Sequence, residues 1–144
     1  MSLRVTMTLY MDGTEVRRLP VSAGYVTLAS DQKIVKHAIN ELFHVAAFLE
    51  KNRPEQMLPE FNLLRVHLPD GSNVDIGGDM FMNCVIWDGL LKQGADPTSV
   101  IADAKRHRTA LDGLEASTDI MLAKVITDAY ITVTSVIREV PTDA

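Results

Sequence analysis

SDQKIVKHAINELFHVAAFLEKN, residues 30–52, is the stretch that decides the fold of this chain. Its apolar residues recur at three- and four-residue spacing, which places them on one face of a helix. They are Val35, Ala38, Ile39, Leu42, Ala46 and Leu49. Ser30 or Asp31 can cap the start, because each has a side-chain oxygen that accepts a free backbone N–H. Pro54 limits the far end, so we predict a helix over residues 31–52.

A β-hairpin is predicted before this helix. Apolar and polar residues alternate over residues 3–11, as in a half-buried strand. Asp12-Gly13 then suits a two-residue turn, and a bulge near Arg17-Arg18 restores the alternation in the returning strand. This register pairs Met11 with Thr14, Leu9 with Val16, Met7 with Leu19, and Val5 with Val21. A short third strand is predicted over residues 25–29, so strands occupy about residues 3–29.

A second hairpin is predicted over residues 63–76, after the helix. Apolar residues alternate on both sides of Pro69-Asp70-Gly71, which suits a three-residue loop with a left-handed glycine. The register pairs Leu68 with Ser72, Val66 with Val74, and Leu64 with Ile76. The inner residues of this hairpin then share one face, which supports the register independently.

The rest of the chain predicts three helices, over about residues 80–93, 97–114 and 118–140. Asp79 is the expected cap of the first, which is apolar nearly all round and is therefore expected to be buried, within the domain or at a subunit contact. Residues 130–137 are β-branched enough for a strand. Their apolar residues fit the helical period better, so we predict helix there.

These elements predict an α+β fold. Antiparallel hairpins form one sheet with helices packed on one face, and the C-terminal half is all-helical. The length of 144 residues fits a single domain over residues 1–144, and 47% hydrophobic residues are enough for a substantial core.

Charge and cysteine content narrow the classes of partner and compartment. A net charge of -5 disfavours nonspecific binding to nucleic acid or anionic membranes, because their phosphates repel an acidic protein. No uninterrupted apolar run reaches the roughly 18 residues of a membrane span, and the alternating N-terminus does not resemble a signal peptide. Cys84 is the single cysteine, which fits a reducing cytosol. We therefore expect a cytoplasmic protein.

One row of the helix over residues 31–52 holds a candidate metal or acid–base site. His37, Glu41 and His44 lie along one edge, and imidazole and carboxylate are ordinary metal ligands. Histidines seven residues apart are about 10 Å apart along a helix, too far to share one ion without other elements. The competing interpretation is a partly exposed polar row beside the buried face.

Basic residues provide two candidate sites for an anion. Residues 105–108 form a basic cluster in which His107 and Arg108 fall near the apolar seam of their helix, where a polar group needs a partner or covers the seam with its stem. On the outer face of the predicted strands, four side chains project together, as a possible phosphate-binding surface or an ordinary solvated face. They are Arg4, Arg17, Arg65 and His67.

Two further features are interpreted as structural. Gly77-Gly78-Asp79 precedes a helix but lacks the glycine spacing and lysine of phosphate loops, so it predicts a strand-to-helix turn. Cys84 lies within an apolar helix without a histidine partner nearby in sequence, which predicts an inert core thiol.

Two functional hypotheses remain open. The first is a non-enzymatic binding protein, a homodimer or higher closed oligomer through its C-terminal helices. It would bind a protein partner, including a target that it inhibits, or a small anionic ligand such as a nucleotide through Arg17, Arg65, His67, His107 and Arg108. The alternative is a small metal-assisted or acid–base enzyme using His37, Glu41 and His44. No motif in the sequence predicts a cofactor or a catalytic residue.

Overall fold

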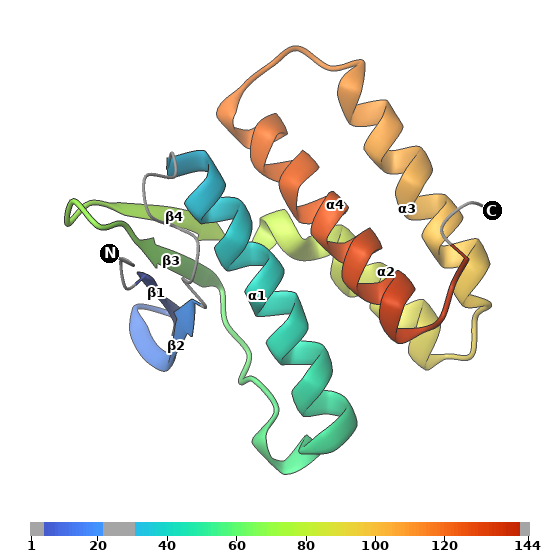
Figure 1. Cartoon of the computed structure of the whole chain (residues 1–144), viewed down its shortest axis with the longest axis horizontal. Helices are drawn as coiled ribbons and strands as arrows, with labels where there is room; N and C mark the ends of the chain where they lie inside the picture. The colour runs from blue at the N-terminus through green and yellow to red at the C-terminus, as the bar shows by residue number, and fades with distance from the viewer. Residues whose placement is uncertain (1–4, 22–30, 142–144) are drawn as a thin grey trace. The chain divides into compact units, whose positions relative to one another are not determined.

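The computed structural model describes residues 5–21 and 31–141. The chain divides into two compact units, Met1–Asp79 and Met80–Ala144, which are described one at a time. Among the described residues, an antiparallel sheet and the long helix α1 belong to the first unit, and helices α2, α3 and α4 belong to the second (Figure 1). The predicted α+β class and the helical C-terminal half are confirmed, whereas the single domain stays a prediction.

Three expectations from the sequence lie outside the described residues. They are Arg4 on the outer sheet face, Ser30 as a helix cap, and the third strand over residues 25–29. The described part of the first strand begins at Val5, and the described part of the long helix begins at Asp31.

Strands β1 (Val5–Met11) and β2 (Thr14–Val21) form the first hairpin. Asp12 and Gly13 have φ of 50° and 83°, the two positive values that a two-residue turn of this kind needs. The outer pairs, Met7 with Leu19 and Val5 with Val21, are those predicted.

The bulge in this hairpin lies at Val16, one residue before the predicted Arg17-Arg18. Tyr10 pairs with Glu15 and Leu9 pairs with Arg17, so the predicted pair of Leu9 with Val16 is wrong. The apolar alternation requires one extra residue between the turn and Leu19. It does not determine which residue is extra, because several side chains between the turn and Leu19 are polar and need not face the core.

Strands β3 (Leu63–His67) and β4 (Asn73–Gly77) form the second hairpin in the predicted register. Gly71 has φ of 90°, and the backbone N–H of Leu68 donates to the Ser72 carbonyl at 2.8 Å. The four described strands form one antiparallel sheet in the order β2-β1-β3-β4. One face collects the buried side chains of Val5, Met7, Leu9, Leu64, Val66 and Ile76.

Helix α1 (Asp31–Asn52) contacts β1 and β2. Its buried residues are Ile34, Val35, Ala38, Ile39 and Leu42. Ala46 and Leu49, predicted on the same face, are only half-buried. The predicted face is therefore correct over the first half of α1, and burial weakens towards its C-terminal end. A short 3-10 turn, η1 (Pro54–Gln56), follows the helix.

The second unit begins inside a 3-10 turn, η2 (Gly78–Phe81), which leads directly into α2 (Met82–Lys92). Phe81 occupies the N-cap position and no side chain caps the helix, so the prediction of Asp79 as the cap is wrong. The physical reason is that the 3-10 turn starts at Gly78 and already contains Asp79. Gly94, with φ of 92°, lies just beyond the end of α2, as predicted.

Helices α3 (Pro97–Asp112) and α4 (Thr118–Ile137) complete the second unit. The Ser117 hydroxyl caps α4 by accepting the backbone N–H of Ile120 at 3.1 Å. Residues 130–137 are helical, as predicted. α3 buries Val100, Ile101, Ala104 and Leu111. Leu114, within the predicted range of this helix, is exposed and lies beyond its end at Asp112.

Helix α4 ends three residues earlier than predicted. Glu139 has φ of 56°, and the backbone N–H of Val140 reaches back to the Ser135 carbonyl at 2.9 Å. This is the usual left-handed termination of a helix, with glutamate where glycine is preferred. Val136 and Ile137 are exposed beside this turn.

Within the described residues, α4 is long and apolar enough to cross a bilayer by length and composition alone. Its mean hydropathy is 1.6 over an 18-residue window, of which 33% is buried in the chain. A core helix of a soluble protein passes the same test, so this property is weak evidence for a membrane span.

Candidate functional site

The outer face of the sheet carries a row of polar side chains placed by strand pairing. Thr8 on β1 pairs with Arg18 on β2 and with Arg65 on β3, and Arg65 pairs with Asp75 on β4. Cross-strand partners lie side by side on one face. The arginines on this face are therefore Arg65, as predicted, and Arg18 in place of the predicted Arg17.

Arg17 was predicted on the outer face, but the register pairs it with Leu9, whose side chain is fully buried. The bulge at Val16 is the cause, because one extra residue exchanges the faces of the residues that follow it. Arg18 instead forms an ion pair with Glu15 at 2.8 Å. Arg18 could be identified only once the position of the bulge was known, and the apolar alternation of the sequence does not determine that position.

Arg65 is held by two groups on its own sheet. Its Nε and Nη2 donate to the two carboxylate oxygens of Asp75 at 2.7 and 3.0 Å, a bidentate arrangement. Its guanidinium carbon lies 5.2 Å from the centre of the Tyr10 ring. The hydrogen bonds from Arg65 lower the pKa of the Asp75 carboxyl below its ordinary value. An anion binding at Arg65 would therefore compete with a carboxylate already in place.

His67 lies in a chain of three side chains on the same face. Its Nε2 is 2.7 Å from the Thr8 hydroxyl, and its Nδ1 is 3.0 Å from the Asn73 side-chain oxygen. The Asn73 side-chain oxygen can only accept a hydrogen bond, so the ring proton of His67 is assigned to Nδ1. The Thr8 hydroxyl then donates to Nε2. The order hydroxyl, imidazole, orienting group matches that of nucleophilic triads. Thr8, however, is 0% exposed, so its hydroxyl has no route to a substrate in this arrangement.

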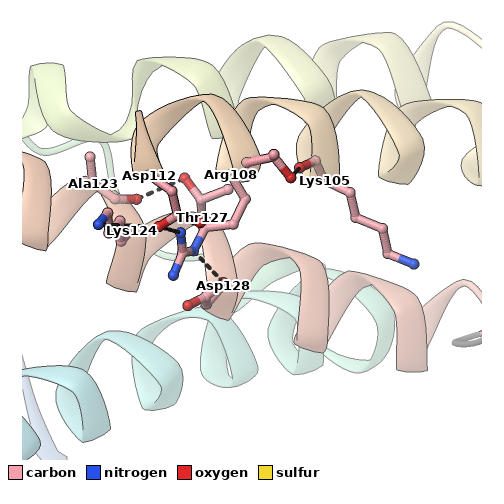
Figure 2. A network of polar contacts seen from close by, with 8 residues as sticks. Lys105, Arg108, Asp112, Ala123, Lys124, Thr127 and Asp128 are labelled. Atoms are coloured by element: carbon pink, nitrogen blue, oxygen red, sulfur yellow. Dashed lines mark hydrogen bonds and ion pairs between the residues drawn. The ribbon is translucent and has the colours of Figure 1, made fainter. Parts of the chain in front are cut away.

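Arg108 belongs to a cluster of charges that joins α3 to α4 (Figure 2). Its Nε donates to Asp128 of α4 at 2.9 Å, and its Nη1 donates to Asp112 at 2.8 Å. Lys124 of α4 also lies 3.2 Å from Asp112. The hydrogen bonds from Arg108 and then Lys124 lower the pKa of the Asp112 carboxyl. Acidic side chains of the same chain are thus the partners that Arg108 was expected to need.

The other members of the basic cluster have separate neighbours. The His107 Nε2 accepts a hydrogen bond from the Asn83 amide of α2 at 3.2 Å, and its ring meets the Trp87 ring edge-on at 5.6 Å. Arg106 forms an ion pair with Asp103 one turn earlier. His107 therefore joins α3 to α2, while Arg108 joins α3 to α4. The cluster is a set of helix contacts, and Arg65 and His67 belong to the other unit.

The histidine row of α1 lies at the edge of the buried face, as expected for a partly exposed polar row. His37 and Glu41 are half-buried, and His44 is exposed. Over residues 5–21 and 31–141, no three side chains of His, Cys, Asp or Glu gather as a metal-binding group. The metal-assisted enzyme stays a prediction that would need ligands from elsewhere.

Gly77, Gly78 and Cys84 have structural neighbours. The Gly78 N–H donates to the Asn62 carbonyl at 2.8 Å, and a Cβ on Gly78 would lie 3.0 Å from the Asn62 backbone. This close approach explains the glycine without a bound anion. Cys84 is buried, and burial raises the pKa of its thiol to about 12, which fits an unreactive core side chain.

Helix α2 has an exposed apolar side as well as a buried one. Cys84, Trp87 and Leu91 are buried, but the opposite side exposes a second apolar set. Its members and their exposed fractions are Met82 (54%), Val85 (62%), Ile86 (53%) and Leu90 (39%). We call these four residues the α2 face. A helix that is apolar nearly all round was expected to be buried, within the domain or at a subunit contact, and the single chain buries only one side of it.

The fold and the geometry of its candidate sites can be compared with those of known proteins. Such a match would connect the sheet face, the α3–α4 charge cluster or the α2 face to a known activity. No protein-family model matches this chain, and no curated protein or solved structure matches it either.

Proposed function

We propose that this chain is a non-enzymatic interaction protein that assembles into a homodimer or higher closed oligomer through its helical unit and binds a protein partner. The exposed α2 face is the observation that carries the proposal. Contiguous exposed apolar patches of more than a few hundred Å² are rare on monomers. Removing such a face from water is favourable, and symmetric association of identical chains is the commonest way to do so.

A small anionic ligand is the less supported alternative. Arg65 is bound to Asp75, and Arg108 is bound to Asp112 and Asp128. A phosphate or carboxylate would have to displace these charge-assisted hydrogen bonds before it gained its own. The apolar face of α2 has no such competitor, so it has priority as the functional surface.

We also propose that the protein works in a reducing compartment, the cytoplasm. The support is that Cys84, the single cysteine in the sequence, is buried as a free thiol. Neither assembly nor folding then depends on disulfide formation.

Sedimentation velocity over a range of micromolar concentrations tests the proposal. We expect a species heavier than the 15.9 kDa monomer for the native chain. Val85→Glu places a charge in the α2 face and should shift the protein to monomer, because a buried unpaired charge is costly at an interface. Since Val85 is exposed in the single chain, its replacement should leave the helical circular dichroism intact.

Thr98→Glu is the matched control. Thr98 is exposed in the first turn of α3, where an acidic side chain is tolerated or favourable. This variant adds the same charge as Val85→Glu but should sediment like the native chain. A well-folded monomer of the native chain at every concentration would remove self-association from the proposal.

A further inference from the structure

We propose that the turn of the first hairpin is a modification site, at which the backbone nitrogen of Gly13 attacks the side-chain carboxyl group of Asp12 and converts Asp12 to isoaspartate. Ring closure joins this nitrogen to Cγ and releases one water molecule. The resulting succinimide takes up one water molecule again, and opening at the main-chain carbonyl leaves the chain running through the side-chain carbon. The net change is an isomerisation that needs no reactant except water.

The sequence offers four places for this reaction, because four of the eight glycines directly follow an aspartate. Glycine favours the ring closure, since it has no side chain to hinder the approach of its nitrogen. The four steps are Asp12-Gly13, Asp70-Gly71, Asp88-Gly89 and Asp112-Gly113. The dipeptide is the same at each step, so the structure decides which of them reacts first.

The attacking nitrogen is available only at Gly13. Within the described part of the chain, the backbone N–H of Gly13 donates to no backbone carbonyl. The N–H groups of Gly71 and Gly113 donate to carbonyls three residues earlier, at 3.0 and 3.1 Å. Gly89 lies inside α2, where each N–H donates to the carbonyl one turn earlier. A nitrogen held in this way has to lose its hydrogen bond before it can turn towards a side chain.

The carboxyl group is also less reactive at two of the other steps. The neutral acid is the form that reacts, because a carboxylate repels the nitrogen and has no good leaving group. Hydrogen bonds from Arg108 and Lys124 lower the pKa of the Asp112 carboxyl, and hydrogen bonds from Ser72 lower that of Asp70. A lower pKa leaves less neutral acid at a given pH.

Asp12 has a neutral partner instead. The Asn62 side-chain nitrogen donates to the Asp12 carboxylate at 2.8 Å. An amide adds no positive charge that would hold the carboxyl group in its ionised form.

The backbone of the turn is suited to ring closure. Asp12 and Gly13 have φ of 50° and 83°, and a Cβ built on Gly13 would meet nothing within 4 Å. Type I′ and type II′ turns share a positive φ at the first central residue and differ in the orientation of the central peptide. Rotating this peptide turns the Gly13 nitrogen towards the Asp12 side chain, and glycine tolerates the φ of either turn.

The modification should release the turn from the residue that precedes β3. Asn62 accepts from the Asp12 N–H at 3.1 Å, donates to the Asp12 carboxylate, and donates through its own N–H to the Tyr10 carbonyl at 2.9 Å. Isoaspartate lengthens the main chain by one carbon and moves the carboxylate, so both contacts with Asp12 are lost. Backbone hydrogen exchange should then be faster near the turn.

Incubation of the native chain in oxygen-18 water at neutral pH tests the proposal. Each passage through the succinimide adds one heavy oxygen atom at the aspartate concerned. Digestion in ordinary water and mass spectrometry then locate the label, and chromatography separates the isoaspartyl peptide. We expect Asp12 to take up label roughly tenfold faster or more than the other three aspartates, because each of these steps must first break a hydrogen bond.

The same chain unfolded in urea is the matched control, since it has the same four dipeptides without these hydrogen bonds. Its four steps should react at similar rates. Native labelling of Asp70 or Asp112 as fast as that of Asp12 would overturn the proposal, as would an unlabelled Asp12 in the time the unfolded chain needs to react.

Asp12→Glu provides a second control. It keeps the carboxylate but would need a six-membered ring, so the peptide that contains the turn should stay unlabelled. Labelling of this peptide at the native rate would show that the oxygen enters without ring closure, which would also overturn the proposal.

Discussion

At the scale of single residues, Arg65 and Arg108, the arginines expected to bind an anion, are engaged by acids of the same unit. Arg65 lies between Asp75 and the Tyr10 ring, and Arg108 is bound by Asp112 and Asp128. Exposed pairs of this kind contribute little stability, because water and salt screen their attraction. Their main consequence is that charge counted in a sequence does not measure charge available to a ligand.

Acid should weaken the contact between α3 and α4 through Asp112. Its pKa is lowered by the hydrogen bonds from Arg108 and Lys124, so its contribution is complete above the pKa of an unfolded aspartate and is lost as pH falls through the lower folded pKa. Native chain and Asp112→Asn should therefore differ in urea stability at about pH 6 and converge at about pH 2. A difference that stays constant or grows towards acid would contradict the assigned sign.

Leu42 should be the most sensitive test of the buried face of α1. It is buried, so Leu42→Ala should destabilise the fold by about 2–5 kcal/mol through lost burial and a residual cavity. Asn40, two residues away, is only half-buried, and Asn40→Ala should cost far less. Urea melts of the two variants provide the comparison, and equal losses would show that the face is wrongly placed.

At the scale of elements, α2 and α4 show where helical periodicity is insufficient. α2 has two apolar sides, and only the side with Cys84, Trp87 and Leu91 is buried. α4 stops at Ile137 although Val140 continues the apolar spacing beyond it. Glu139 in a left-handed conformation turns Val140 back, so the chain ends the helix with an unfavourable residue.

Glu139→Gly should stabilise the helical unit by about 0.5–1 kcal/mol, because glycine adopts the left-handed conformation without the penalty of a side chain. Glu139→Ala removes the same carboxylate but keeps a Cβ, so it should bring no such gain. Thermal or urea melts of the pair measure the effect. Similar stabilities of the two variants would indicate that the charge of Glu139, and not its backbone conformation, decides the outcome.

At the scale of the whole molecule, self-association depends on which apolar residues remain exposed. Apolar residues close together on α4 differ in exposure, since Val133 is 3% exposed whereas Ile137 is 40% and Val136 is 69% exposed. A charge at Val133 therefore tests the core of the helical unit, and a charge at an exposed position tests the surface.

Val133→Glu should unfold the helical unit or destabilise it by several kcal/mol, about 3 or more, because it buries an unpaired carboxylate. Val136→Glu, on the exposed side of the same helix, should leave the fold intact. Circular dichroism melts distinguish the two. A folded Val133→Glu protein with native stability would mean that the buried side of α4 is misassigned.

The sequence by itself determined the α+β class, the buried face of α1, both hairpin turns and the helical state of residues 130–137. These features depend on the period of apolar residues and on turn chemistry within a few positions, such as Asp12-Gly13 and Gly71, so they are readable locally.

Only the tertiary structure decided where the first hairpin bulges, which carboxylates hold Arg65 and Arg108, and which side of α2 stays exposed. Each depends on residues that arrive from another element: β4 brings Asp75 to Arg65, and α4 brings Asp128 to Arg108. The observed bulge differs in position from the predicted one because the residues before Leu19 are polar and do not determine where it lies. Both sides of α2 are apolar, and they differ only in what packs against them. Residue type alone therefore cannot predict which side is buried.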